Sequence, residues 1–295
     1  GGFSSGSAYK QITLMAALEQ GYTINDTISS KPLSNEVREE IGAPINGRSY
    51  PSGCKGSGGT LSSHVQASSN CAFMRLQNSI GFDAVKEMGI RLGLNPESLD
   101  PSSVRPPCFT IGCDALVTPL GMASAFSTIV NEGRRNPAHF VEKVTDRDGN
   151  VLYEFVPPNE QVVSADNTRQ AMKAMERVVQ AGTCTRCRLP NGQPAAGKTG
   201  TVELGDGGRN IGMWFSGFTP HMATAVWVGD PLDQKSGLSG GSLQGGRIAG
   251  PIWQRFMASY LEGAPVLDFP DPGRISGGRA IPDEWGSADS EDEDD

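Results

Sequence analysis

The first segment of the chain decides how the rest is arranged: residues 6–21 read GSAYKQITLMAALEQG. From Gln11 onward the apolar residues recur at helical spacing, and Gly21 is a typical helix stop. Ser7 then lies at or just before the first turn, and Lys10 follows three residues later on the same face. A helix start favours an oxyanion and lowers the pKa of a nearby lysine. The spacing predicts a serine nucleophile with a lysine base, although Ser-x-x-Lys also arises by chance and such a serine is often only an N-cap.

Composition and charge limit the classes of protein to which the chain can belong. Its 295 residues are 37% hydrophobic, enough for one large domain or two modest ones. No apolar run approaches the ~20 residues that cross a membrane, and no signal peptide is visible, so we expect any membrane anchor of a parent protein to lie outside this chain. The net charge of −8 comes from residues 283–295, which hold eight acidic and no basic residues. The remainder is neutral overall, which disfavours a nucleic-acid surface.

The chain divides into two regions by its pattern. Residues after position 263 lose all helical or strand periodicity and end in the acidic run. We therefore predict one folded domain over residues 1–263 and a disordered acidic tail over residues 264–295. Such a tail is typically a solubilising segment, with binding of a partner as the alternative.

Cysteines indicate the redox setting of the chain. An even number that includes two close pairs, Cys108/Cys113 and Cys184/Cys187, favours disulfides in an oxidising compartment. Free structural thiols, or a zinc or redox site built from the close pairs, are the alternatives. Spacing leaves the connectivity open, because Cys54 and Cys71 can also take part.

Two kinds of secondary structure follow one another along the chain. Helical periodicity and capping residues predict helices over 61–67, 71–80, 81–92, 118–130 and 164–182, and turn residues predict a hairpin around Asp148-Gly149-Asn150. Short apolar stretches then predict antiparallel strands over 195–202, 212–218 and 223–228. A last amphipathic helix over 251–261 would cover one face of this sheet through Ile252, Trp253, Phe256 and Tyr260. The predicted fold class is α/β of the α+β type, an antiparallel sheet flanked by helices with a mainly helical lobe.

Two further stretches carry groups suited to acyl-transfer chemistry. Ser68-Ser69-Asn70 lies at a turn between predicted helices, where a hydroxyl can relay a proton and an amide can hold a peptide. Ordinary capping of the next helix is the alternative interpretation. Residues 197–201 read GKTGT, in which the glycines keep a strand bare and Lys198 and the threonines offer a cation and hydroxyls to a carboxylate. A plain strand with a solvated lysine would look the same.

Taken in order, Ser7-x-x-Lys10, Ser68-x-Asn70 and Lys198-Thr199-Gly200 resemble the motif set of penicillin-binding proteins and serine β-lactamases. With its surrounding stretches, most of the chain over residues 3–262 resembles the transpeptidase domain of class A (bifunctional) penicillin-binding proteins. The resemblance implies a serine-type D-Ala-D-Ala transpeptidase of peptidoglycan synthesis, an antibiotic target at the extracytoplasmic face of the bacterial cell membrane. It implies peptidoglycan stem peptides and β-lactams as partners, with no nucleic acid, metal or cofactor.

The resemblance also assigns a role to each motif residue. Ser7 would attack the carbonyl between the two terminal D-alanines, and Lys10 would accept its proton. Ser68 would pass a proton to the leaving amine, while Lys198 sets the local field. Backbone N–H groups of Ser7 and Thr201 would form the oxyanion hole. The substrate-binding residues would be Asn70 for the peptide amide, and Thr199, Gly200 and Thr201 around the terminal carboxylate.

The chain departs from the family pattern at its start. It begins six residues before Ser7, whereas family members have sheet strands ahead of the nucleophile helix. We therefore expect the domain to be N-terminally incomplete, with an open sheet edge. Three other functions fit the motifs: a D,D-carboxypeptidase, a β-lactamase, and a non-catalytic β-lactam-sensing or envelope-binding domain.

Overall fold

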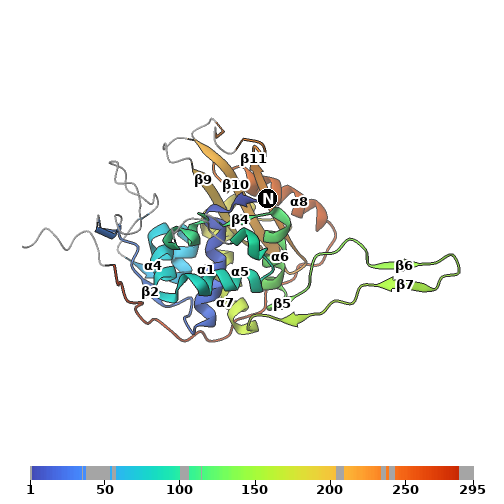
Figure 1. Ribbon diagram of the computed structural model, residues 1–295, viewed down its shortest axis with the longest axis horizontal. Helices are drawn as coiled ribbons and strands as arrows, with labels where there is room; N and C mark the ends of the chain where they lie inside the picture. The colour runs from blue at the N-terminus through green and yellow to red at the C-terminus, as the bar shows by residue number, and fades with distance from the viewer. Residues whose placement is uncertain are drawn as a thin grey trace, which may run out of the picture.

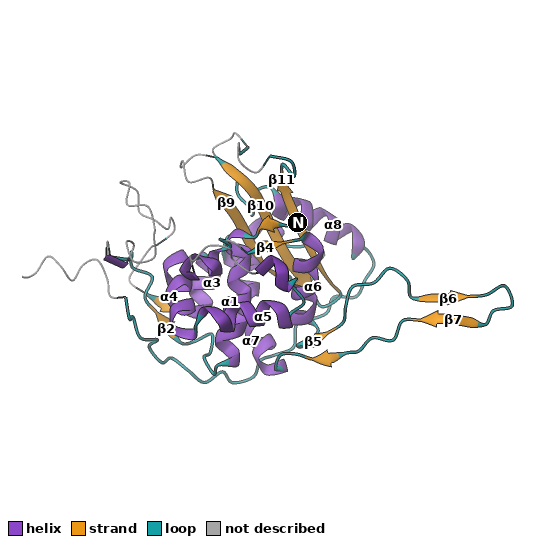
Figure 2. Ribbon diagram, viewed as in Figure 1, coloured by secondary structure: helices purple, strands orange, loops and turns teal. Residues whose placement is uncertain are grey.

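An antiparallel sheet lies above a lobe of helices, and a long hairpin projects from the side of the lobe (Figure 1). The computed structural model describes residues 2–34, 36–37, 54, 58–99, 106–113, 115–203, 209–233, 237–238 and 243–285. Figure 2 shows that the helices gather below the sheet, with one further helix beside it. The predicted α+β fold class is thus confirmed.

The central helix of the lobe is α1 (Lys10–Glu19). Helices α4 (Asn70–Ile80), α5 (Phe82–Arg91) and α7 (Ala165–Ala181) all contact it. Every residue of α1 from Lys10 to Leu18 is buried, although the sequence pattern indicated only one apolar face. A helix that is enclosed on all sides cannot rotate or shift, so it fixes the positions of the residues at its start.

The remaining helices of the lobe match their predicted positions. They are α3 (Leu61–Ala67) and α6 (Pro119–Val130), which join α4, α5 and α7 within one residue or two of the expected bounds. Helix α6 begins as its sequence predicts, because the Thr118 hydroxyl accepts the Gly121 N–H and Pro119 takes the first position. It packs between the lobe and the sheet, contacting α7 on one side and two strands on the other. Short 3-10 turns complete the lobe: η1 (Gly6–Tyr9), η2 (Pro96–Leu99) and η3 (Pro106–Ile111).

The sheet has three antiparallel strands in the order β11-β10-β9. They are β9 (Ala196–Glu203), β10 (Asn210–Thr219) and β11 (Met222–Gly229), as the sequence predicts. Side chains of β10 alternate between its two faces, so Phe218 packs against Phe126 of α6 while Phe215 packs against Trp253 of α8 (Ala249–Tyr260). The sheet is therefore held between the helical lobe and one covering helix.

The buried face of α8 differs from the predicted one. Trp253 and Met257 are fully buried, but Ile252, Phe256 and Tyr260 are 39%, 49% and 54% exposed. Ala249 and Gly250 at the start of the helix are also buried, and a Cβ at Gly250 would collide with Cys184 Sγ. Apolar periodicity therefore predicted the contact of Trp253 correctly, but not the exposure of Ile252, Phe256 and Tyr260.

Disulfides join Cys54 to Cys71 and Cys184 to Cys187. The second bond staples the 3-10 turn η4 (Thr185–Cys187) between α7 and β9. Gly250 of α8 packs directly on both of these sulfurs, where a Cβ would collide with Cys184 Sγ. The predicted disulfide chemistry is confirmed, whereas the pairing of Cys54 with Cys71 is one that spacing did not single out.

Part of the expected disordered tail packs on the lobe. The Thr27 N–H donates to the Arg279 carbonyl, and the Ile281 N–H donates to the Thr27 carbonyl, beside the short ladder of β2 (Thr27–Ile28) and β3 (Gly59–Thr60). Asp283 forms a 2.8 Å ion pair with Arg75, which is only 2% exposed. Partners in the lobe thus contact residues 279–283 in the structure, while the division into a folded domain over residues 1–263 and a disordered tail over residues 264–295 stays a prediction. Residues 286–295 lie outside the described part of the chain.

Asp26 is the polar centre of this attachment. Its carboxylate is fully buried and accepts the N–H groups of Thr23, Gly278 and Arg279 at 2.8 to 2.9 Å. The Arg279 guanidinium adds an ion pair at 3.3 Å. Burial by itself raises the pKa of Asp26, but these hydrogen bonds outweigh burial and hold the pKa below its ordinary value.

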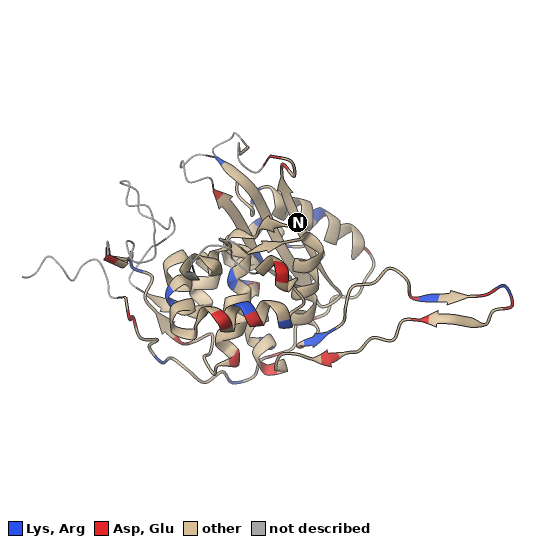
Figure 3. Cartoon of the chain, viewed as in Figure 1, with Lys and Arg blue, Asp and Glu red and all other residues tan. Residues whose placement is uncertain are grey.

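The predicted hairpin is present and extends away from the body of the protein. Its strands are β6 (Lys143–Thr145) and β7 (Val151–Glu154), in which every residue is exposed. Figure 3 shows basic and acidic positions interspersed along it. Lys143 and Glu154 lie opposite each other and form an ion pair at 3.6 Å. Two further short ladders pair β1 (Phe3–Ser4) with β4 (Leu116–Val117), and β5 (Arg134–Arg135) with β8 (Glu160–Gln161).

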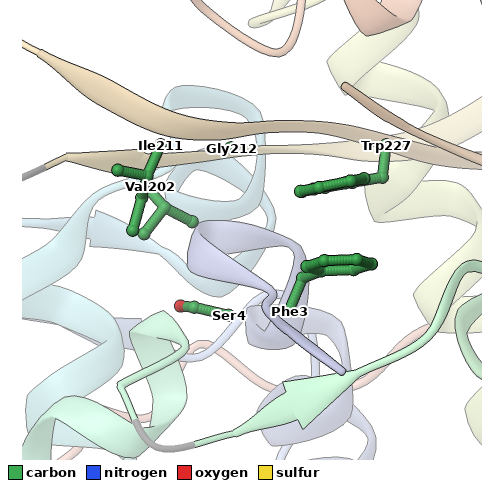
Figure 4. A pocket seen from close by; sticks show the side chains of 6 residues that line it. All are labelled: Phe3, Ser4, Val202, Ile211, Gly212 and Trp227. Carbon is green, nitrogen blue, oxygen red and sulfur yellow. The ribbon is translucent and has the colours of Figure 1, made fainter. Parts of the chain in front are cut away.

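A small depression lies between β1 and the sheet. Figure 4 shows the ring of Phe3 facing that of Trp227, and their centroids are 3.6 Å apart. Ser4, Val202, Ile211 and Gly212 line the rest of it. The lining is mostly apolar and includes neither of the motif lysines. We therefore interpret the depression as part of the contact between the N-terminal strand and the sheet. Within the part of the chain that the structure describes, no helix is long and apolar enough to span a membrane.

Replacing Asp26 by alanine should destabilise the domain by about 2 kcal/mol, because three backbone N–H groups lose their buried acceptor. We expect the melting temperature to fall by about 5 °C in a calorimetric scan at neutral pH. The exposed Asp268, replaced by alanine, is the matched control and should change stability by less than about 0.5 kcal/mol.

The pH dependence tests the same contact. A carboxyl whose pKa is lowered by folding stabilises the folded state above its unfolded pKa of about 4 and loses that effect as the pH falls through the lowered value. The difference between wild type and Asp26→Ala should therefore shrink in acid. A constant difference from neutral pH down to pH 2 would contradict this account.

Candidate active site

Three segments far apart in the sequence meet between the sheet and the helical lobe. Turn η1 leads into the buried helix α1, the Ser68-Ser69-Asn70 turn joins α3 to α4, and β9 is an outer strand of the sheet that contacts η1. Each segment carries one of the motifs found in the sequence. The structure thus brings the three motifs together.

Backbone contact between η1 and β9 sets the position of Ser7. Gly6 has φ +53°, and a Cβ there would lie 2.8 Å from the Thr201 carbonyl oxygen. Gly200 in turn lies directly against the Ser5 carbonyl, which leaves no room for a side chain. Glycine is therefore required at both positions for the serine turn to lie on the strand. Ser7 is half-buried and directly follows the glycine that contacts the Thr201 backbone.

The helix start differs slightly from the prediction. The sequence pattern predicted a helix from Gln11, whereas the chain forms the 3-10 turn η1 first and α1 begins at Lys10. Ser7 therefore lies in a 3-10 turn, and the Lys10 N–H donates to the Ser7 carbonyl. The tighter turn still places the lysine one turn beyond the serine, as the spacing predicted.

Two buried lysines converge on one serine hydroxyl. Lys10 Nζ donates to the Ser68 carbonyl and to Asn70 Oδ1, both at 2.6 Å, and lies 3.3 Å from Ser68 Oγ. Lys198 Nζ donates to Ser68 Oγ at 2.7 Å and to the Thr199 carbonyl at 3.1 Å. Ser68 reaches this position through a left-handed backbone, with φ 59°. The hydroxyl of Ser68 therefore connects the helix lysine to the strand lysine.

Burial shifts the pKa values of both lysines downward, and repulsion adds to the shift of Lys10. Each side chain is 0% exposed. Burial lowers the pKa of Lys10 well below its ordinary value, and the charge of Lys198 lowers it further. Burial lowers the pKa of Lys198 to about 7. A lysine in this site can therefore be neutral near physiological pH, and a neutral amine has the lone pair that a general base needs.

Neighbouring residues have structural roles. The Ser69 hydroxyl accepts the Ala72 N–H and caps α4, so the capping interpretation of this tripeptide holds for its middle residue only. His64 is buried in α3, and its Nε2 lies 3.0 Å from the Ile28 carbonyl. The hydroxyl and amide on either side of Ser69 remain directed at the lysines.

Thr199 and Thr201 lie on one face of β9, because strand side chains alternate. The Thr201 hydroxyl accepts the Gly245 N–H at 3.1 Å, and the Thr199 hydroxyl lies 2.7 Å from the Thr183 hydroxyl. Sequence analysis did not include Thr183 or Gly245 in the site. Thr183 follows the predicted helix 164–182, and its position near a turn is the only local signal, which many surface threonines share.

The arrangement can support acyl transfer through a serine. It combines a hydroxyl beside backbone N–H groups, a lysine able to act as base, a second hydroxyl that can carry a proton, and paired threonines suited to a carboxylate. Among the residues that the structure describes, no group of three or more His, Cys, Asp or Glu side chains is placed to hold a metal ion.

Comparison with protein families and curated proteins gives a consistent match. Residues 1–258 match the family model for the penicillin binding protein transpeptidase domain. Penicillin-binding protein 1A of Mycolicibacterium smegmatis is 31% identical over 300 residues, which cover 95% of this chain and 36% of that protein. Penicillin-binding protein 1A of Aquifex aeolicus is 33% identical over 270 residues, which cover 90% of this chain and 34% of that protein. The chain thus spans about a third of the length of these curated relatives.

Solved structures agree with the fold. The penicillin-binding protein PonA1 of Mycobacterium tuberculosis superposes with a TM-score of 0.80 at 26% identity, covering 95% of this chain and 75% of that one. A second structure of PonA1, in complex with penicillin V, superposes with a TM-score of 0.79.

The lowered lysine pKa values have a measurable effect on stability. Between pH 7 and about pH 9 the unfolded chain carries a proton on Lys198, whereas the folded chain has lost part of it. The free energy of unfolding should therefore rise with pH over this range. We expect a smaller rise in Lys198→Met, measured by urea denaturation at each pH.

Lys173→Met is the matched control, because Lys173 is 59% exposed. This variant should keep the wild-type pH slope. Equal slopes in wild type and Lys198→Met would show that Lys198 does not titrate in this range.

Proposed function

The chain belongs to the penicillin-binding protein transpeptidase family, and we propose on this basis that it is a serine D,D-transpeptidase that cross-links peptidoglycan stem peptides. The observation that carries the proposal is the hydrogen-bonded group of Lys10, Ser68, Asn70 and Lys198, in which Lys10 follows Ser7 by one turn and donates its N–H to the Ser7 carbonyl. It supplies a base and a proton carrier, with the base directly after the turn that holds the nucleophile.

In the first step, Ser7 Oγ attacks the carbonyl carbon between the two terminal D-alanines. Neutral Lys10 takes the serine proton. The backbone N–H groups of Ser7 and Thr201 donate to the oxyanion, a role supported by the close contact of Gly6 with the Thr201 backbone. In other acyl-transfer enzymes, one such donor contributes about 3 to 4 kcal/mol to transition-state stabilisation.

The tetrahedral adduct then collapses, and the bond from the carbonyl carbon to the nitrogen of the last D-alanine breaks. Lys10 returns the proton through Ser68 Oγ, which lies within hydrogen-bond distance of Lys198 and 3.3 Å from Lys10. The leaving nitrogen receives it and departs as the amine of D-alanine. Ser7 is left as an ester, and each lysine is back in its starting protonation state.

Substrate position depends on the groups around this centre. Asn70 holds the peptide amide of the donor, while the hydroxyls of Thr199 and Thr201 bind the terminal carboxylate. Gly200 keeps the strand bare where the peptide lies.

In the second step, an amine of another stem peptide attacks the Ser7 ester. The amine gives up its proton along the same relay, Ser7 recovers its hydroxyl, and a cross-link is made. A β-lactam would imitate the donor and remain bound as the acyl-enzyme. We place the protein at the extracytoplasmic face of the bacterial cell membrane, where such substrates are found.

Benzylpenicillin should add one covalent equivalent to the wild-type chain and none to Ser7→Ala, measured by intact-protein mass. A lasting single adduct is expected, because the acyl-enzyme of a transpeptidase reacts slowly with water. An adduct on Ser7→Ala, or none on the wild type, would contradict the role of Ser7.

A donor stem peptide then separates the possible activities. Release of D-alanine with transfer to an added amine supports the transpeptidase, and release into water alone would indicate a carboxypeptidase. A short-lived adduct with consumption of penicillin would indicate a β-lactamase. Acylation without any turnover of stem peptide would indicate a β-lactam sensor.

Ser68→Ala should slow acylation by about 100-fold, the usual size for a lost proton-transfer group. The control is Ser69→Ala, which removes the α4 cap and should lower stability by about 1 kcal/mol while acylation stays near wild type. Stopped-flow measurement with a chromogenic cephalosporin gives both rates. Equal rates for the two variants would argue against a relay through Ser68.

A further inference from the structure

Both threonine hydroxyls of β9 have hydrogen-bond partners from outside the three motifs. The Gly245 N–H donates to Thr201 Oγ1 at 3.1 Å. The Thr183 hydroxyl lies 2.7 Å from Thr199 Oγ1, and either oxygen can be the donor in that pair. Thr199 itself is only 6% exposed, whereas Thr183 is exposed to solvent.

The chemistry of a carboxylate ligand selects one direction for each bond. A hydroxyl has one proton to donate, and an ionised carboxylate can only accept. Thr201 already accepts from Gly245, so its own proton is free to point to a ligand. Thr199 can donate to the same ligand only if Thr183 is the donor in their shared bond. A carboxylate ligand therefore requires that the Thr183 hydroxyl donates to Thr199 and that the Thr199 hydroxyl donates to the ligand.

The turn that carries Thr183 is held in place from several sides. The Cys184–Cys187 disulfide closes the turn immediately after it, and both sulfurs pack on Gly250 of α8. Gly246 lies directly against the Thr183 carbonyl, so no side chain fits at this position. A Cβ placed on Gly246 would also lie 3.4 Å from Thr199 Cγ2. The Thr183 hydroxyl is thus presented to Thr199 by a braced corner of the fold.

We propose that Thr183 is a positioning residue for recognition of the substrate carboxylate, which acts by donating its hydroxyl proton to Thr199. The inference rests on the proposed function, because it takes the terminal carboxylate of a stem peptide or the carboxylate of a β-lactam as the ligand. It adds a residue from outside the three motifs to that site. Thr183 orients the Thr199 proton and has no part in the bond-making steps.

The test compares two β-lactams that differ in the carboxylate. Benzylpenicillin and its methyl ester are each reacted with wild type, Thr183→Val and Thr183→Ser, and the second-order acylation rate constant is measured by intact mass. Valine keeps the shape of threonine and removes the hydroxyl. We expect Thr183→Val to react about fivefold more slowly with benzylpenicillin, the effect of one hydrogen bond of ordinary strength. Thr183→Ser should restore the rate.

The methyl ester separates recognition from structure. Its rate should be the same for wild type and Thr183→Val, because it lacks the ionised group that Thr199 would bind. Thr185→Val is the matched control, an exposed threonine in the same disulfide-closed turn, and should keep wild-type rates with both compounds. Adding Thr183→Val to Thr199→Val should cause no further loss with benzylpenicillin, since the two residues act through one hydroxyl.

Each other outcome overturns the inference. Unchanged rates in Thr183→Val, an equal loss with both compounds, or a failure of serine to restore the rate would all exclude the positioning role. If the wild type is not acylated by either compound, the proposed function itself fails and the inference falls with it. Acylated wild type with unaffected variants removes the inference alone.

Discussion

The site depends on one constraint: two lysine side chains, both withdrawn from water, share a single serine hydroxyl. Ser68 Oγ lies 2.7 Å from Lys198 Nζ and 3.3 Å from Lys10 Nζ. Burial disfavours the charge on each lysine, and the charge of Lys198 further disfavours that of Lys10. The lysine pKa values fall as a result, which converts a residue that is normally a cation into one that can accept a proton.

Much of the fold serves to keep that geometry. Helix α1 is buried along its length, so packing on all sides holds the residues at its start in place. The Gly6 and Gly200 backbones allow the serine turn to lie on β9. In the lobe, capping by Ser69 starts α4 immediately beside the lysines. An enzyme that relies on short hydrogen bonds needs such support, because displacement by about 1 Å is enough to lose most of the rate.

Support also comes from parts of the chain with no catalytic motif. The turn closed by Cys184–Cys187 joins α7 to β9 and packs on α8, so three elements meet behind the strand that bears Lys198. Elsewhere on the lobe, residues 278–283 attach to the buried Asp26 carboxylate and the buried Arg75 guanidinium. Polar groups inside the fold therefore determine where these irregular segments run.

Local patterns were enough to determine the elements and the candidate chemistry. Periodicity and capping located the helices and the antiparallel strands, because side-chain alternation and end groups act over a few residues. The order of the Ser7, Ser68 and Lys198 motifs indicated the family, which the match over residues 1–258 confirmed. Tertiary structure alone decided which face of α8 is buried, how residues 264–285 pack, and that Thr183 meets Thr199. These features depend on contacts between residues far apart in sequence, whose energies no short stretch of sequence contains.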